Sequence, residues 1–402
     1  MKPRSVLLVT PRWTRDGGVA THVVASAVAL AGRGVDVHVL AARLELEEPV
    51  AGITLHRSAD LFNARASPEA RFGEARSLAP SVIHLHQFED PEVVSLMQQN
   101  APVVLSVHGY SACTSGVHYF RPGHECDRAH GPGCAPNLLL RGCAHARNPL
   151  PLPAAYRRVT RSLQVLHRVE AAISYSSVID RHLARNGVAR RATVPLFATV
   201  APARAAGHEH RRRVVFAGRV VPPKGVDVLI RAARSVQAEF VVCGDGRQLG
   251  QMRELARSLE VAERVRFTGW LSPEELAREL AEASVVVMPS LWPEPAGLVG
   301  IEAFAAGRPV IASATGGVGD WLQEGVNGLL VAPGDADALA RALAELLADP
   351  ARQQAMGAAG RRMVAERFTP EQHVAALLRA YATARASWER PRDAQRRHGA
   401  MA

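Results

Sequence analysis

Short apolar runs alternate along the chain with longer segments that have the period of an amphipathic helix. In the first half the runs are SVLLVT, VDVHVLAA, VIHLH and PVVLSVH; in the second half they are RVVFAG, EFVVCG, VRFTG, VVVMPS and PVIAS. Nearly unbroken apolar runs of this length are typical of parallel strands buried on both faces. Helical segments such as GVATHVVASAVALAGRG and GVDVLIRAARSV lie between them. The alternation predicts an α/β protein with parallel sheets covered by helices.

The rhythm breaks at residues 194–213, where Ala, Pro and charged residues replace the periodic pattern. A chain of 402 residues is also too long for one ordinary core. We therefore expect two Rossmann-like domains, residues 1–197 and 198–369. The run HVAALLRAYATAR predicts a last amphipathic helix within residues 370–387, whose apolar face must pack against the protein. We expect the polar tail, residues 388–402, to be disordered.

Composition narrows the class of protein. Apolar residues make up 48% of the chain and charged residues 21%, as in globular proteins. The net charge is +10, but the arginines are spread out and aromatic residues are only 5%, which argues against a nucleic-acid-binding surface. The first apolar run is too short for a signal peptide, and no segment offers the ~20 apolar residues of a membrane-spanning helix. We expect a cytoplasmic protein with reduced thiols.

One lysine stands out among the basic residues. Lysine and arginine total 48, yet Lys224 and Lys2 are the only lysines. Lys224 follows Arg219 by five positions, between a predicted strand and the helical segment VDVLIRAA. A flexible ammonium and an arginine fork beside a helix N-terminus suit the oxygens of a phosphate group. The alternative is a pair of solvated surface cations.

Two glutamates lie in the segment PSLWPEPAGLVGIEAFAAG. If Glu294 and Glu302 belong to one helix, eight residues of spacing leave them within about 80° of each other and roughly 12 Å apart along the axis. Two such carboxylates can accept hydrogen bonds at the two ends of an elongated ligand, such as a sugar nucleotide. The alternative is one glutamate in the first turn and one exposed on the helix, although the apolar surroundings of Glu302 disfavour an unpaired charge.

Glycines and a histidine follow several of the predicted strands. Gly17 and Gly18 come after the first strand, and Gly316 and Gly317 after a late one. At such positions a ligand can approach the backbone closely, although a tight turn explains each pair equally well. His108 follows the strand PVVLSV and can serve as donor, acceptor or proton carrier. Ligands of doubly wound sheets bind at these strand ends.

Together these residues resemble the GT-B glycosyltransferases, specifically the retaining family 4 that includes bacterial mannosyl- and glucosyltransferases. The matching segments are DGGVATHV, SVHG, FAGRVVPPKGVDVLIRAA, VVCGDG, VRFTGWLSPEEL and EPAGLVGIEAFAAGRPVIASATGGVGDWLQEGVNGLLVAPGDADALARAL. They cover the second half almost continuously and the first half in patches. The resemblance implies the GT-B fold, with two Rossmann-like domains facing a central cleft and the C-terminal helix returning to the N-terminal domain.

The resemblance also implies roles. Arg219 and Lys224 would grip the donor diphosphate, Glu302 the ribose hydroxyls and Glu294 the hydroxyls of the donor sugar, while His108 would approach the phosphate and sugar from the other domain. Family members need no catalytic metal, and the leaving phosphate is described as accepting the proton of the acceptor. The remaining donor-binding positions that it implies are Gly17, Gly18, Gly218, Gly297, Leu298, Gly316 and Gly317.

The sequence departs from the family at one position of this site. Where the family commonly has Phe-Gly, this chain has Ala296 before Gly297, which leaves the identity of the donor sugar open. We expect a hexosyltransferase that moves a sugar, with retention, from a nucleotide-diphosphate sugar to a carbohydrate or lipid-linked acceptor in polysaccharide, glycolipid or glycoconjugate biosynthesis. The alternatives are a non-catalytic nucleotide-sugar-binding component of a biosynthetic complex and a sugar-nucleotide epimerase of the same fold. A phosphorylase would need a cofactor-binding lysine, and only Lys224 and Lys2 are present.

Residues 109–153 have no strand or helix period but contain four cysteines. Four thiolates, or three with an imidazole, can form a tetrahedral structural zinc site that would fix this loop. Reduced thiols and a disulfide pair are the alternatives, because no C-x-x-C pair is present. The residues concerned are Cys113, Cys126, Cys134 and Cys143, with His118, His124, His130 and His145 as the nearby imidazoles.

The segment AAYRRVTRSLQVLHRVEAAI predicts a basic amphipathic helix in the N-terminal domain. Such a helix can touch the anionic inner face of a membrane, where the protein would be peripheral, and a merely solvated basic face fits the same pattern.

Overall fold

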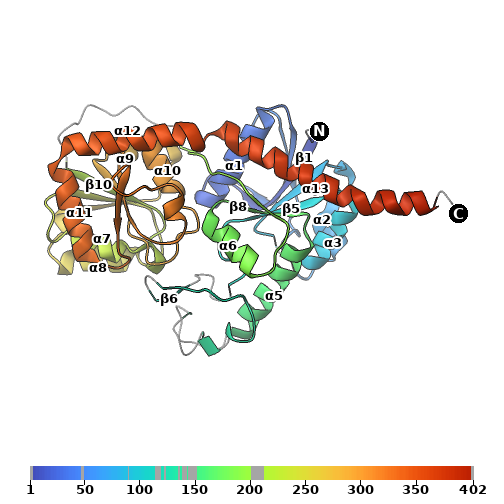
Figure 1. Cartoon of the computed structure of the whole chain (residues 1–402), viewed down its shortest axis with the longest axis horizontal. Helices are drawn as coiled ribbons and strands as arrows, with labels where there is room; N and C mark the ends of the chain where they lie inside the picture. The colour runs from blue at the N-terminus through green and yellow to red at the C-terminus, as the bar shows by residue number, and fades with distance from the viewer. Residues whose placement is uncertain are drawn as a thin grey trace.

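The computed structural model describes residues 3–46, 49–88, 90–113, 119–121, 124–134, 136–137, 143, 152–200 and 212–399. These residues form two lobes, each a parallel β-sheet with helices on its faces (Figure 1). The predicted α/β class and the pair of Rossmann-like domains are confirmed. The exact boundary at residue 197 stays a prediction, because residues 201–211 lie outside the described residues.

The N-terminal lobe is built on a seven-stranded parallel sheet in the order β3-β2-β1-β4-β5-β8-β9. Its strands are β1 (Ser5–Trp13), β2 (Asp36–Leu44), β3 (Ile53–Arg57), β4 (Val82–His86), β5 (Val103–Val107), β8 (Ala171–Ser174) and β9 (Arg191–Thr193). Its helical elements are α1 (Gly18–Ala31), α2 (Pro68–Phe72), η1 (Gly73–Leu78), α3 (Pro91–Asn100), α5 (Leu152–Arg168) and α6 (Ser177–Arg185). A small antiparallel hairpin, β6 (Tyr119–Arg121) with β7 (His124–Glu125), lies in the cysteine-containing loop.

The C-terminal lobe repeats the architecture with a six-stranded sheet in the order β12-β11-β10-β13-β14-β15. Its strands are β10 (Arg213–Ala217), β11 (Glu239–Cys243), β12 (Val265–Gly269), β13 (Val285–Met288), β14 (Val310–Ser313) and β15 (Gly328–Val331). Its helical elements are η2 (Pro222–Lys224), α7 (Val226–Ala232), α8 (Leu249–Ser258), η3 (Ala262–Arg264), α9 (Pro273–Glu282), α10 (Leu298–Ala305), η4 (Gly316–Asp320), α11 (Ala336–Ala348) and α12 (Pro350–Arg367).

Every apolar run that predicted a strand is a strand in the structure. Most of the runs are buried because helices cover both faces of each sheet; the five residues of β4, β5 and β10 are all buried. Strand β12, at an edge of its sheet, is the exception and is mostly partly exposed. The apolar runs did not predict β3, β6, β7, β8, β9 and β15. Strands β3 and β9 form the two edges of their sheet and are partly exposed, so they lack the apolar run on which the prediction depended.

The last helix, α13 (Pro370–Gly399), returns to the N-terminal lobe as the resemblance implied. Figure 1 shows α12 lying along the C-terminal lobe and α13 continuing across the other lobe, where it contacts α1, β5 and β8. Val374, Leu377 and Tyr381 of α13 are buried in this contact. The prediction of a disordered tail from residue 388 was wrong for the described residues, because the helix continues to Gly399. The tail has three alanines and four arginines among its 15 residues, which are good helix formers, and a polar composition alone does not separate a helix from disorder.

Among the described residues, no helix combines the length and apolar character needed to cross a bilayer.

Candidate functional site

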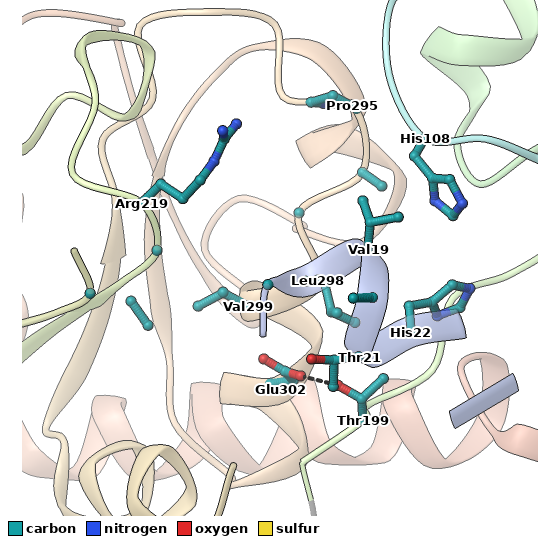
Figure 2. Close-up of a pocket in the computed structure, with 18 of the residues that line it drawn as sticks. Val19, Thr21, His22, His108, Thr199, Arg219, Pro295, Leu298, Val299 and Glu302 are labelled. Carbon is teal, nitrogen blue, oxygen red and sulfur yellow. Dashed lines mark hydrogen bonds between the residues drawn. The ribbon is translucent and has the colours of Figure 1, made fainter. Parts of the chain in front are cut away.

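A cavity of about 530 Å³ is lined by residues of both lobes. Figure 2 shows Arg219, Leu298 and Glu302 on the C-terminal side of this cavity, opposite His22 and His108. Ten of the residues that the sequence singled out line it: Gly17, Gly18, His108, Gly218, Arg219, Lys224, Glu294, Gly297, Leu298 and Glu302. The structure therefore brings together positions that are up to 285 residues apart in the chain.

Lys224 is held at the cavity by a rigid turn. It ends η2, which begins with two consecutive prolines, and Gly225 follows in the left-handed conformation with φ of 66°. A Cβ atom at Gly225 would lie 1.9 Å from the carbonyl oxygen of Pro289, so only glycine fits there. The backbone thus reverses sharply before α7 and leaves the ammonium directed toward the cavity.

The Lys224 ammonium forms an ion pair with Glu294. Its Nζ atom donates to both carboxylate oxygens, at 2.9 and 2.8 Å. Glu294 Oε2 also accepts from Ser290 Oγ at 2.9 Å and from Trp292 Nε1 at 3.3 Å. Lys224 lies 5.6 Å from the centre of the Trp292 ring, a distance at which a cation is attracted to an aromatic face. The pair is thus a fixed polar centre in a largely buried site.

The expectation that both glutamates lie on one helix was wrong. Helix α10 begins at Leu298, so Glu302 is helical whereas Glu294 lies in the preceding loop. Pro295 disfavours the helical conformation at Glu294. Gly297, the N-cap of α10, has a φ of 85° and its Cβ position lies 2.9 Å from the Trp321 ring. Both glutamates nevertheless line the same cavity.

Arg219 follows Gly218 at the end of β10 and is exposed. Its side chain extends into the open part of the site in Figure 2. Within the described ranges, the guanidinium has no ion pair, in contrast to Lys224. Arg219 is therefore available to an anionic ligand without breaking an existing contact.

Glu302 is a buried carboxyl group. It is 5% exposed, and its Oε1 atom accepts a hydrogen bond of 2.6 Å from Thr199 Oγ1 (Figure 2). Burial raises the pKa of Glu302 to about 7, while the bond from Thr199 works in the opposite direction. The carboxylate form is thus short of hydrogen-bond donors, which the hydroxyl groups of a ligand can supply.

The N-terminal lobe contributes the start of α1. Gly17 caps this helix with a φ of 98°, and a Cβ atom at Gly17 or Gly18 would meet nothing within 4 Å. The first turn of α1 therefore faces open space at the cavity. A helix N-terminus in this position favours a negatively charged group.

Gly316 and Gly317 do not line the cavity as the sequence suggested. A Cβ atom at Gly316 would lie 2.3 Å from the backbone nitrogen of Glu294, and one at Gly317 would lie 2.8 Å from the carbonyl oxygen of Pro295. Gly317 N also donates to the Glu294 carbonyl oxygen at 2.7 Å. The two glycines allow the loop that carries Glu294 to approach the backbone closely, and their part in donor binding stays a prediction.

His108 lies at the end of β5 and lines the cavity from the N-terminal lobe. Its Nε2 atom is 3.1 Å from Nδ1 of His86, and its ring stacks on Tyr175 at a centroid distance of 5.0 Å. Burial lowers the pKa of His108 to about 4. The imidazole is therefore neutral near pH 7.

Several residues of the site were not predicted from the sequence. Ser290 and Trp292 support Glu294, Thr199 bonds to Glu302, and Trp270 lines the cavity with 47% of its surface exposed. The signal for Ser290 and Trp292 was their position within four residues of Glu294. Thr199 lies in the irregular segment between the lobes, where no strand or helix period marks a residue as part of a site.

The zinc site expected in the cysteine loop stays a prediction. Cys113, Cys126, Cys134 and Cys143 are all partly buried. In the part of the chain that the structure describes, no three Cys, His, Asp or Glu side chains are grouped as metal ligands would be. Two of the expected imidazoles, His118 and His145, lie outside the described residues.

The hairpin of the cysteine loop reaches the other lobe. Glu125 at the end of β7 accepts a hydrogen bond of 2.9 Å from the backbone nitrogen of Gly316. The loop therefore lies next to the segment that carries Glu294.

Two family models match the chain in succession. The model described as Glycosyltransferase Family 4 matches residues 16–196, and the model described as Glycosyl transferases group 1 matches residues 203–363. A GDP-mannose-dependent alpha-(1-6)-phosphatidylinositol monomannoside mannosyltransferase from Mycobacterium tuberculosis is 41% identical over 165 residues, which are 38% of this chain and 43% of the relative. A D-inositol 3-phosphate glycosyltransferase from Streptomyces avermitilis is 33% identical over 251 residues, 56% of this chain and 53% of the relative. The matches thus span about half or less of these relatives' length.

Solved structures share the whole fold at low sequence identity. A sucrose-phosphate synthase from Thermosynechococcus elongatus superposes with a TM-score of 0.75 at 23% identity and covers 96% of this chain and 100% of its own. HepE from Anabaena, solved in complex with UDP and glucose, superposes with a TM-score of 0.69 at 16% identity and covers 94% of this chain and 100% of its own. The two-lobed arrangement of this chain is therefore shared with these solved structures.

Proposed function

Since the chain belongs to the family 4 glycosyltransferases with the GT-B fold, we propose that it is a retaining glycosyltransferase that moves a sugar from a nucleotide-diphosphate sugar to an acceptor hydroxyl. The observation that carries the proposal is the Lys224–Glu294 ion pair in a cavity lined by both lobes, with Arg219 and Glu302 beside it. Cations and carboxylates in one cavity match a ligand that has a diphosphate flanked by two polyhydroxylated rings.

Lys224 and Arg219 would neutralise the negative charge of the leaving group. One additional negative charge develops on the nucleoside diphosphate as its bond to the sugar carbon breaks, and groups placed to stabilise that charge lower the barrier. Lys224 is already fixed at the cavity, and Arg219 is exposed beside it, so both can bind diphosphate oxygens. The first turn of α1 adds positive potential from the opposite lobe. With this charge supplied by the protein, the proposed reaction needs no metal ion.

The carboxylates orient the two rings of the donor. Glu294 already accepts hydrogen bonds from Lys224, Ser290 and Trp292, which fix its position. Three of these four bonds end on Oε2, so sugar hydroxyls can donate to Oε1. Glu302 has one donor, Thr199, and can accept from the hydroxyls of the ribose. In the proposed step, the bond from the sugar carbon to the phosphate oxygen breaks, the acceptor oxygen bonds to the same face, and the leaving phosphate takes up the hydroxyl proton.

Both the residues of the site and the names of the relatives support a class of substrate. The M. tuberculosis relative is named as dependent on GDP-mannose and as acting on a phosphatidylinositol mannoside, and HepE was solved with UDP-glucose. We propose a nucleotide-diphosphate hexose as donor and a carbohydrate or lipid-linked acceptor. We also propose that the exposed arginines of α5 hold the enzyme, as a peripheral protein, against an anionic membrane surface that carries such an acceptor.

The test is turnover by variants of the ion pair. Lys224→Ala and Glu294→Ala should each lower kcat by about 100- to 1,000-fold, because each removes charge from the reacting centre. Nucleoside diphosphate release from a panel of sugar nucleotides, with and without acceptors, measures the loss. Glu345→Ala is the matched control, since Glu345 is an exposed glutamate on α11 paired with Arg352.

The same assay separates the alternatives. A binding component would bind sugar nucleotides, seen as an increase in Tm, without releasing nucleoside diphosphate. An epimerase would convert the sugar of the donor in the absence of any acceptor. Unchanged turnover in both ion-pair variants would contradict the proposed site.

A further inference from the structure

Five buried or pocket-lining histidines lie together in the N-terminal lobe beside the cavity: His22, His84, His86, His108 and His373. Four of them have less than 3% of their surface exposed, and His108 is partly exposed in the cavity. Imidazoles in such number are unusual in a dry core, since each has a donor and an acceptor nitrogen that need partners. Most of these nitrogens have a hydrogen-bond partner, in most cases a hydroxyl or carbonyl oxygen outside the cluster, and the unpaired ones are therefore informative.

His86 is the member that contacts His108. His86 ends β4 and His108 follows β5, and these two strands are neighbours in the sheet. His86 Nδ1 lies 3.1 Å from His108 Nε2. The other nitrogen of His86, Nε2, is buried and has no hydrogen-bond partner among the described residues. Tyr175, stacked on His108, fixes the plane of the ring that faces the cavity.

Both imidazoles are neutral near pH 7. Burial lowers the pKa of His108 to about 4 and that of His86 well below its ordinary value, to which the neighbouring His84 and His108 contribute. One proton therefore lies between His86 Nδ1 and His108 Nε2, and it belongs to one of the two rings. The ring that carries this proton determines the tautomer of His108, and therefore whether the other nitrogen of His108 is a donor or an acceptor.

The unpaired Nε2 atom of His86 indicates which of the two rings carries the shared proton. If His108 donates from Nε2, His86 accepts at Nδ1 and its own proton must be on Nε2, as an N–H group without acceptor in the core. If His86 donates from Nδ1, the unpaired Nε2 is a lone pair. Buried N–H groups without acceptors are rarer in native proteins than acceptors without donors. The second arrangement is favoured, and it leaves the proton of His108 on Nδ1, the nitrogen not bonded to His86.

We propose that His86 is a positioning residue that fixes His108 as the tautomer protonated at Nδ1, so that the cavity meets a hydrogen-bond donor and not a base. For catalysis this rests on the proposed function: His108 would donate to an oxygen of the bound donor, and the acceptor proton would go to the leaving phosphate instead of to His108. The tautomer itself is a property of the free protein.

The direct test is the nitrogen NMR spectrum of the histidine rings in the wild-type protein, assigned with His108→Asn. We expect the proton of His108 on Nδ1 and none on Nε2 near pH 7. A proton on Nε2 of His108 would overturn the proposal whatever the activity of the protein. Because this measurement needs no turnover, failure of the proposed function and failure of the tautomer assignment are distinguishable.

Variants of His86 test the consequence. His86→Ala removes the donor and should lower kcat by about 10- to 100-fold with little change in KM, as for other residues that orient a functional imidazole. His86→Asn places an amide N–H near the former Nδ1 and should restore most of the activity and the tautomer. Equal activity of His86→Ala and wild type, or no rescue by a folded His86→Asn, would overturn the proposal.

The control is His84→Asn. The rings of His84 and His86 are 4.2 Å apart and both are buried, but His84 bonds to Tyr381 Oη and Ser106 Oγ, both at 2.7 Å, and not to His108. This variant should lower the Tm while the tautomer of His108 and kcat of the folded fraction stay near wild type. A loss of kcat equal to that of His86→Ala would show a merely structural effect and would count against the proposal.

Discussion

At the scale of single residues, Lys224 shows why one position kept an ammonium in a chain that otherwise uses arginine. Its Nζ atom lies within 2.9 Å of both oxygens of Glu294, and the Trp292 ring lies 5.6 Å away. A compact charge on a flexible stem can bond to a carboxylate here and turn toward a phosphate. A planar guanidinium is larger and has a fixed set of donor directions, so Arg is not an equivalent replacement.

The raised pKa of Glu302 should make the free energy of unfolding depend on pH. Because burial raises its pKa from 4.5 in an ordinary glutamate to about 7, the folded protein binds this proton more tightly than the unfolded chain does. The associated stability is fully present below about pH 4.5 and is lost as the pH rises through about 7. Glu302→Gln cannot lose the proton, so its free energy of unfolding relative to wild type should increase by about 3 kcal/mol between those limits.

Urea unfolding of both proteins from pH 5 to 8 measures this difference. Glu324→Gln, at an exposed position of the same lobe, is the control and should show no such trend. A difference between Glu302→Gln and wild type that does not change with pH would mean that Glu302 titrates like an exposed glutamate.

At the scale of elements, turns at the ends of strands and helices determine which side chains reach the cavity. Gly225 before α7 and Gly297 before α10 are both left-handed, and in both cases a Cβ atom would collide with a neighbouring segment. These glycines let the chain reverse within a few residues, so that Lys224 and Glu294 meet although they are 70 positions apart. Gly316 and Gly317 of η4 likewise allow a close approach, from the other side of the Glu294 loop.

The basic face of helix α5 should contribute to binding at an anionic membrane surface. Arg157, Arg158 and Arg161 are exposed on α5 and project within about 100° of each other around its axis. Each arginine near an anionic bilayer contributes about 1 kcal/mol, so changing all three to Gln should weaken binding to vesicles containing anionic lipid by about 100-fold. Binding should also fall as the salt concentration rises.

Co-sedimentation with anionic and with neutral vesicles measures this effect. The matched control changes three exposed arginines of the C-terminal lobe, Arg234, Arg341 and Arg362, and should bind as wild type does. Equal weakening by both triple variants would indicate a net-charge effect and not a binding face on α5.

At the scale of the whole molecule, the lobes are joined by a few polar contacts and by the last helix. Asp320 of η4 accepts from the backbone nitrogen of Ser177 at 2.7 Å and from Ser177 Oγ at 2.5 Å, at the first turn of α6. Ser176 donates to the Pro295 carbonyl oxygen, beside Glu294. These bonds cross between the lobes next to the cavity, so they affect how the two halves of the site face each other.

Asp320→Ala tests this contact. The variant leaves the first amide of α6 without its carboxylate and should lower the free energy of unfolding by about 1–2 kcal/mol, the usual effect of losing an N-terminal cap. Urea unfolding of Asp320→Ala, Ser177→Ala and the double variant gives the coupling between the two side chains, which we expect to be about 1 kcal/mol. Additive effects of the two changes would contradict a direct contact between the lobes at this point.

Much of the fold and part of the site could be predicted from the sequence. The apolar runs identified nine strands because buried parallel strands must be apolar on both faces. The edge strands β3 and β9 were missed because exposure removes that constraint. The length of α13 was missed because a solvated helix and a disordered tail have similar compositions.

The sequence by itself determined the two parallel sheets and the residue types of the site, because strand burial, tight turns and phosphate recognition each impose a local choice of residue. Only the tertiary structure decided which of these residues meet. Glu294 lies in a loop rather than on α10, Thr199 reaches Glu302 across 103 positions, and His86 reaches His108 across two neighbouring strands. The physical reason is that a hydrogen bond or a pKa depends on atoms a few ångströms away, and those atoms come from segments that no local pattern connects.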